Sequence, residues 1–481
     1  MRLHLLVGLL LACAAPVAAQ QDLPSGSPME LPTLGSGAAD HATVAANHEG
    51  DWLIANHADH PSGGKLVEVT VATPKNSGGR FRVTAPILIG DPSLDLVGDD
   101  SCRKPDVVAL HDGSFAVVFP RTVQQDPQSG RLEIVRILTR DAQGDALSTP
   151  IVESPGSGRG YVIDASVVPG EAGVMPDLAS LGPTHASACA VVYANEAEVV
   201  ETEDLVFREY DLRIARIDFG QPQQSTDFIR GPWLLETGIP MDNEVDSPFA
   251  GGIILPDMVL DDADNLVVAW EQYLFAPHQG LPQGAQGRVV MTRYKSLDGA
   301  QPLERLDRLE LAGQADLRQQ RRPALDSNRE DQVNGIAITW TDREPLGLLN
   351  RVQYQLLEFP NGSMPGVSPP VPAYWVDSPL FGDAYPVTIL GEDDGLTFAV
   401  RDYGIDRELL ASYSTVSGRR TMVEIDMGIQ FPWRPATALF TVPARRWWQA
   451  DTDYVLQVCE GADVREASAY RVHVRIDPIG D

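Results

Sequence analysis

Short apolar segments separated by turn residues run along nearly the whole chain. The clearest example begins at Pro256 with an apolar segment, passes through an acidic turn at residues 261–265 and a second apolar segment that ends before Glu271, and closes with residues 288–294. Such segments are rich in β-branched and aromatic residues and are bounded by Gly, Pro, Asp and Asn, which is typical of antiparallel strands joined by turns. Helical periodicity is nearly absent, so the pattern predicts an all-β protein.

The same order of segments recurs along the chain. In the copies that begin at Pro105, Pro256 and Pro386, the residue after the second apolar segment lies fifteen positions beyond the proline. Four weaker copies begin at Ala42, Pro176, Pro323 and Pro435. Self-similarity of this kind indicates one structural unit repeated in tandem. The seven predicted units span residues 40–90, 104–155, 175–233, 254–312, 322–377, 385–428 and 434–481.

The seventh unit supplies only three strands before the sequence stops at Asp481. Residues 28–34 precede the first unit, and their Met-Glu-Leu sequence at 29–31 is similar to Leu-Glu-Leu at 309–311, where a fourth strand is predicted. We expect residues 28–34 to pair beside residues 470–476, because an open edge would leave backbone donors and acceptors unpaired.

Seven tandem units of this kind, closed by an N-terminal strand, resemble the seven-bladed β-propellers. The resemblance implies four-stranded antiparallel blades that form one domain over residues 20–481. It is architectural only, because the sequence has no Trp-Asp signature, kelch diglycine, sialidase Asp-box or tandem calcium-loop motif. It also implies that the loops between second and third strands, and those leading into first strands, gather on one face around a central channel.

The first nineteen residues predict export as a signal peptide. Arg2 gives a positive start, residues 5–12 form an apolar core, and residues 17–19 offer a small-residue cleavage site. We therefore expect the mature chain, from Gln20, in the periplasm or outside the cell. A lipid anchor on Cys13 is the alternative, because the residues before it loosely match a bacterial lipobox. No other stretch reaches the roughly 20 apolar residues of a transmembrane helix.

Charge and cysteine content narrow the partners and the chemistry. The 37 basic and 67 acidic residues give a formal charge of −30 at pH 7, which disfavours nucleic acid and anionic membranes as partners. A protein or a glycan remains as the partner, although acidity alone also keeps an exported protein in solution. The mature chain has an odd number of cysteines, so we expect buried thiols, with one disulfide as the alternative. These cysteines are Cys102, Cys189 and Cys459.

Polar residues beside the strand ends on the loop-rich face form the candidate site. Those after second strands are His57, His60, Arg121, Asn195, Glu196, Glu271, Tyr273, Asp342, Arg343, Arg401, Asp402 and Glu460. Those leading into first strands are Arg103, Asp246, Arg322, Asp383 and Arg434. The predicted ligand-binding residues are Arg103, Glu196, Tyr273, Arg322, Arg343, Arg401 and Glu460.

Three carboxylates of this set, Glu271, Asp342 and Asp402, are the candidate catalytic residues. Neighbouring carboxylates shift each other's pKa and can then act as acid and base in glycosidic cleavage. The alternative is that acidic residues at strand ends cap turns and pair with arginines of neighbouring units. No nucleophile elbow, phosphate loop, zincin helix or dinucleotide fingerprint is present.

No cofactor is predicted, and a divalent metal is the alternative. His57 and His60, with Asp59 between them, are its candidate ligands because imidazole and carboxylate suit such ions.

These observations lead to three functional hypotheses. The first is a non-catalytic exported propeller that binds a protein or glycan through its loop-rich face. The second is a glycoside hydrolase or lyase that uses carboxylates at the central channel, and the third is a structural component of an envelope assembly.

Overall fold

The secondary structure is almost entirely β. The computed structural model describes residues 21–34, 39–59, 65–76, 79–89, 104–123, 126–155, 160–167, 176–201, 206–242, 256–261, 263–274, 286–295, 303–310, 319–327, 335–343, 350–358, 371–372, 387–390, 395–402, 407–414, 420–425, 427, 432–444, 451–462 and 470–478. The one helix in these ranges is a 3-10 turn at Pro183–His185, and none of their helices could cross a membrane. The predicted all-β class is confirmed.

The strands of the described residues form seven sheets, each of antiparallel neighbours. The first sheet contains β3 (Ala39–Ala46), β4 (Trp52–Asp59), β5 (Lys65–Asn76), β6 (Arg80–Val83), β7 (Ile87–Ile89) and β1 (Gln21–Pro24). The second contains β8 (Asp106–Ala109), β9 (Phe115–Val123), β10 (Asp126–Arg140), β11 (Ala146–Glu153) and β12 (Tyr161–Val167).

The other five sheets have four strands each. The third is β13 (Asp177–Ser180), β14 (Ala188–Glu201), β15 (Val206–Asp218) and β16 (Ile229–Asp242), and the fourth is β17 (Asp257–Leu260), β18 (Leu266–Leu274), β19 (Gln286–Tyr294) and β20 (Arg305–Glu310). The fifth is β21 (Gln319–Ser327), β22 (Gly335–Arg343), β23 (Asn350–Glu358) and β24 (Val371–Pro372), and the sixth is β25 (Val387–Leu390), β26 (Gly395–Asp402), β27 (Arg407–Ser414) and β28 (Arg420–Ile425). The last is β29 (Pro432–Val442), β30 (Thr452–Ala462), β31 (Tyr470–Pro478) and β2 (Met29–Glu30).

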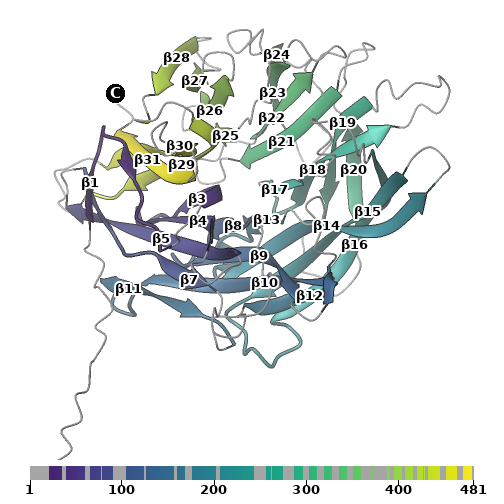
Figure 1. The fold of residues 1–481 in the computed structure, drawn as a ribbon, viewed down its shortest axis with the longest axis horizontal. Coiled ribbons are helices and arrows are strands. Elements are labelled where there is room, and N and C mark those ends of the chain that lie inside the picture. Colours follow the sequence, from purple (N-terminus) through teal and green to yellow (C-terminus); the bar gives the residue numbers. More distant parts are fainter. Residues whose placement is uncertain are drawn as a thin grey trace, which may run out of the picture.

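The sheets are arranged around a common centre, and the first strand of each lies nearest to the middle (Figure 1). These innermost strands contact one another from sheet to sheet, in the order β3, β8, β13, β17, β21, β25 and β29, and β29 also contacts β3. The architecture is therefore of the propeller type, with predominantly four-stranded antiparallel sheets.

The outer strands agree with the sequence in part. The fourth strand predicted around residues 309–311 is present as β20, and residues 80–89 and 420–425 likewise form outer strands, β6 with β7 and β28. The first two sheets exceed the predicted four strands, because β7 and β12 bring the chain back for a second pairing with the third strands β5 and β10, and β1 adds to the edge of β6.

The N-terminal segment lies beside the last strand, as the sequence predicted. Met29 is opposite Val474 in the register of β2 and β31, and the Leu31 N–H donates to the Val472 carbonyl at 2.9 Å. Strand β2, near the start of the described chain, and the last strand β31 therefore belong to one sheet.

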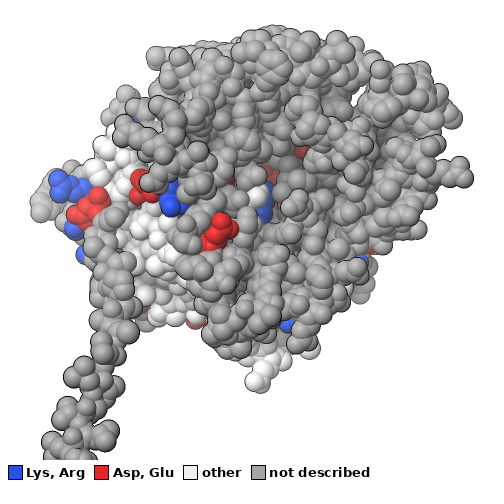
Figure 2. All heavy atoms as spheres, in the orientation of Figure 1, with Lys and Arg blue, Asp and Glu red and all other residues white. Residues whose placement is uncertain are grey.

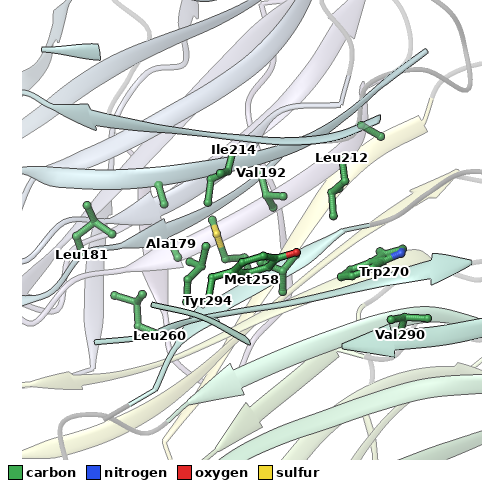
Figure 3. Packing of buried hydrophobic residues seen from close by; sticks show 14 of the residues in the cluster. Ala179, Leu181, Val192, Leu212, Ile214, Met258, Leu260, Trp270, Val290 and Tyr294 are labelled. Atoms are coloured by element: carbon green, nitrogen blue, oxygen red, sulfur yellow. The ribbon is translucent and has the colours of Figure 1, made fainter. Parts of the chain in front are cut away.

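Apolar side chains fill the space between neighbouring sheets. Figure 3 shows the contact between the third and fourth sheets, where Val192 and Ile214 lie near Met258, Trp270 and Tyr294. Similar clusters join the first sheet to the second, the second to the third, the fourth to the fifth, and the last to the first. The second strands β4, β9, β14 and β18 are thus covered on both faces, which explains their unbroken apolar sequences.

Two of the three cysteines of the mature chain are buried thiols, as expected. Cys189 and Cys459 lie on β14 and β30 and have no exposed surface, and burial raises the pKa of the Cys189 thiol. Cys102 lies outside the described residues, as do the predicted signal peptide and the candidate anchor Cys13.

Candidate functional site

Buried polar side chains gather toward one end of the second strands. They belong to the predicted polar ring, and each is at most 6% exposed. They are His57 on β4, Arg121 on β9, Asn195 on β14, Glu271 on β18 and Glu460 on β30. We refer to this set as the polar belt. Its side chains lie beneath the surface rather than on an open rim.

For the remaining predicted site residues, the structure describes only the backbone, or the residue lies outside the described ranges altogether. The strands contain the backbone of Glu196, Tyr273, Arg322, Asp342, Arg343, Arg401, Asp402 and Arg434. Four others, His60, Arg103, Asp246 and Asp383, lie outside the described residues. The binding or catalytic roles of all these residues stay predictions.

Three buried glutamates hold the backbone of nearby segments at the same end of the sheets. The bonds run from the Leu34 N–H to Glu68 at 2.6 Å, from the Gly160 N–H to Glu133 at 2.9 Å and from the Ala42 N–H to Glu460 at 3.1 Å. Each glutamate is only 1% exposed. A buried carboxylate is costly unless it is bonded, and a bond to a charged acceptor is stronger than a neutral one. These glutamates therefore fix the segments that they hold.

Glu68 and Glu133 were not among the residues predicted for the site. The sequence carries a signal for them, because each is a glutamate flanked by apolar residues in a third strand, in Val67-Glu68-Val69 and Leu132-Glu133-Ile134. Glu133 also lies 3.7 Å from the buried guanidinium of Arg121 on the adjacent strand. A buried charge in such a strand needs a partner, and here the partners are loop backbone and a belt arginine.

Two histidines meet beside the polar belt. The rings of His41 on β3 and His57 on β4 are T-shaped with centroids 5.2 Å apart. His57 is buried, whereas His41 is partly exposed. The described residues contain no group of three His, Cys, Asp or Glu side chains suited to a metal ion. The proposed metal pair itself is not tested, since His60 lies outside those residues.

The aspartates of the repeated Pro-Asp motif lie at the centre, on the innermost strands. Two of them accept a hydrogen bond from a backbone N–H of the next sheet. Asp106 accepts from Leu178 at 2.8 Å, and Asp257 accepts from Leu325 at 3.0 Å. In both cases the donor is the residue after the one that aligns with the aspartate in the next repeat. We call this repeated bond the central clasp. It gives the Pro-Asp repeat a structural reason that the sequence alone did not reveal.

The central aspartates are also electrostatically linked. Burial raises the pKa of Asp106, and burial together with repulsion from Asp257 and Asp106 raises the pKa of Asp177 well above its usual range. For Asp257, burial raises the pKa to about 7. The positive charge of Lys104 opposes these shifts. Burial and mutual repulsion therefore both favour the neutral form of these carboxyl groups.

At the turns between first and second strands, acidic residues have structural roles. Asp261 accepts the N–H groups of Ala263 and Asn265 at 2.9 and 2.8 Å and so caps its turn. Asp51 of the first sheet pairs with Arg140 of the second at 2.7 Å. Figure 2 likewise shows acidic and basic atoms side by side on the described part of one face. Turn capping and pairing between sheets therefore account for many of the carboxylates at this end.

Among known proteins, the chain is similar to solved structures but not to a family model or a curated sequence. No family model matches the chain, and no curated protein matches its sequence. Similar structures include an α-L-arabinanase of Penicillium chrysogenum complexed with arabinobiose, with a TM-score of 0.42, 9% identity, and coverage of 94% of this chain and 98% of that one. An ulvan lyase, a polysaccharide lyase, has a TM-score of 0.44 and 8% identity over 92% of this chain and 95% of that one. A Hadza microbial sialidase has a TM-score of 0.39 and 10% identity over 92% and 66%.

Proposed function

We propose that the chain is an exported β-propeller of seven blades, closed into a ring by residues 28–34, which recognises a glycan through the loop-rich face beside the polar belt. The ring is supported by three contacts between the ends of the chain. Strand β2 pairs with β31, β29 contacts β3, and one apolar cluster joins the last sheet to the first. Such closure would leave no sheet edge between the first and last blades.

The observation that carries glycan recognition is the anchoring of backbone segments by three buried glutamates in or beside the belt. A backbone N–H near the loop-rich face donates to the carboxylate of each of them, Glu68, Glu133 and Glu460. Segments fixed before the ligand arrives lose less entropy on binding, so the arrangement favours a preorganised recognition surface. The charge of −30 favours a neutral glycan over an acidic one.

Cleavage of the bound glycan, as a glycoside hydrolase or lyase, is the second candidate function. It requires a carboxylate beside the sugar, and Glu271 is a predicted catalytic residue that belongs to the polar belt and is 2% exposed. Asp342 and Asp402 remain proposed partners for it, on strands β22 and β26.

The test compares binding with turnover in the same protein. The mature chain is titrated calorimetrically with a panel of neutral and acidic polysaccharides, and each mixture is assayed for new reducing ends and for unsaturated sugar products. Glu271→Gln is measured beside Glu304→Gln as a control. Glu304 is an exposed glutamate that pairs with Lys295 at 3.4 Å and directly precedes the outer strand β20. If the chain is an enzyme, turnover falls at least about 100-fold in Glu271→Gln alone, while binding persists.

Binding without turnover in the unaltered chain would assign it the binding function alone. The absence of both binding and turnover across the panel would overturn the proposal. Equal loss in both glutamine variants would remove Glu271 from the catalytic candidates.

A further inference from the structure

We infer that His41 contacts the glycan directly and that the strand holds it in a strained conformation for this role; the inference rests on the proposed function and adds a residue that determines its specificity. His41 lies on the innermost strand of the first sheet, beside the polar belt, and was not among the residues predicted for the site. Three separate observations about its backbone, its neighbours and its ring lead to this assignment.

The backbone of His41 is strained. Among the described residues, only His41 and Asp264 combine a side chain with a positive φ, at 55° and 60°. Asp264 lies in the turn between β17 and β18, where aspartate tolerates this conformation. His41 lies inside strand β3, where the register with β4 shifts between Asp40 and Thr43. Glycine is the usual residue for such a position, and bulges of this kind often redirect a side chain next to a functional site.

The two residues after His41 are fastened to both neighbouring sheets. The Ala42 N–H donates to Glu460 of the last sheet at 3.1 Å, and the Thr43 hydroxyl donates to Asp106 of the second sheet at 3.0 Å. The bulge is therefore held from two sides. A strained residue persists only where its surroundings determine the conformation in this way.

The ring of His41 packs against the ring of His57. His57 is only 3% exposed, whereas His41 as a residue is partly exposed. The Nδ1 atom of His41 is buried, so we assign Nε2 to a hydrogen bond with a sugar hydroxyl and the ring edge to the apolar C–H surface of a pyranose. The ligand class that this chemistry fits is a neutral, hydroxyl-rich sugar unit.

The two strained residues provide a matched experiment. His41→Gly and Asp264→Gly both place glycine at a positive φ, but only the first removes a side chain beside the belt. Each variant of the mature chain is melted thermally and titrated with the neutral polysaccharide that the unaltered chain binds best. We expect both variants to keep a Tm equal to or above that of the unaltered chain. We expect His41→Gly alone to weaken glycan binding at least about 10-fold.

Three outcomes would overturn the inference, and they are distinct. A clear fall in Tm for His41→Gly but not for Asp264→Gly would make His41 a structural residue. Unchanged affinity in His41→Gly would leave the proposed function standing and remove His41 from the site. If the unaltered chain binds no polysaccharide, the proposed function fails and the assignment of His41 to a glycan fails with it.

Discussion

The contact between the last and first sheets is built differently from those in the middle of the chain. Between the second and third sheets, Asp106 on the innermost strand accepts a hydrogen bond from the Leu178 N–H of the neighbouring innermost strand. In the last sheet the position after Pro435 is Ala436, whose methyl group cannot accept a hydrogen bond. The central clasp is thus not available from this sheet toward the first, nor from the fifth and sixth sheets, where Ala324 and Val387 follow the repeat prolines.

Residues 21–34, which we call the N-terminal strap, join the first and last sheets at their outer strands instead of at the centre. Its strand β1 pairs with β6 of the first sheet and its strand β2 pairs with β31 of the last. Leu23 and Leu31, 0% and 4% exposed, enter the apolar cluster between these two sheets. Neighbours that follow each other in the chain are tethered covalently and also pack through apolar clusters. The last and first sheets come from opposite ends of the chain and have no such tether, so the strap joins them by pairing with both.

The largest effect is expected from removing the strap. Deletion of residues 22–35 from the mature chain takes away two buried leucines, each worth about 1.5–3 kcal/mol. It also removes several backbone bonds worth about 0.5–1.5 kcal/mol each. The free energy of unfolding should fall by several kcal/mol, measured by urea denaturation followed by circular dichroism, and size-exclusion chromatography should show association through the freed edge.

Leu31→Ala and Pro28→Ala provide the graded controls for the strap. Leu31 is buried, whereas Pro28 is exposed, so only the first should lower the urea midpoint. An unchanged midpoint after the full deletion would mean that the last and first sheets hold together without the strap, as the middle sheets do.

The second effect concerns the central clasp and pH. Burial raises the pKa of Asp257 to about 7, and an unfolded aspartate titrates near ~3.9. The folded protein therefore binds the proton more tightly. This contribution to stability is complete below about pH 4 and is lost as the pH rises through about 7. Asp257→Asn keeps an oxygen that can accept from the Leu325 N–H but carries no charge. The difference in Tm between this variant and the unaltered chain should therefore shift in favour of the variant by several degrees from pH 5 to pH 8.

Asp164 offers the control of opposite sign. Burial alone would raise its pKa, but hydrogen bonds from Tyr193 and Ser166 and the charge of Arg213 outweigh burial and lower it. Its contribution is present above the unfolded pKa and disappears as the pH falls through the lowered one. Asp164→Asn should therefore lower Tm at pH 6 and above, with the difference shrinking in acid. Parallel pH profiles for the two asparagine variants would contradict this account of the centre.

The sequence predicted the strands much better than the bonds between sheets. Apolar segments with turn residues at regular spacing gave the order of strands in each unit, and the Met-Glu-Leu similarity predicted the place of β2. The bond from Asp106 to the Leu178 N–H joins residues 72 positions apart and depends on the angle between two sheets, which no local pattern encodes.

The polar belt shows the same limit for the candidate site. The position of Glu271 and Glu460 at second-strand ends could be read from the repeat, but their burial depends on how the neighbouring sheets cover them. Glu68 and Glu133 were missed because the candidate site was drawn from residues at strand ends, and these two glutamates lie within third strands. The conformation of His41 has no signal in the residues around it.

The smallest effect is expected at Glu460, where the last sheet bonds to the first. Glu460→Gln keeps an oxygen that can accept the Ala42 N–H, so the free energy of unfolding should change by less than about 1 kcal/mol, whereas Glu460→Ala should cost about 1–3 kcal/mol by leaving that donor buried and unpaired. Urea denaturation of both variants separates the bond from the charge. Equal losses in the two variants would mean that the charge itself joins the last sheet to the first. The contact between the last and first sheets would then depend on charge, as the central aspartates do. The strap would remain as the feature that distinguishes it from the contacts made by the central clasp.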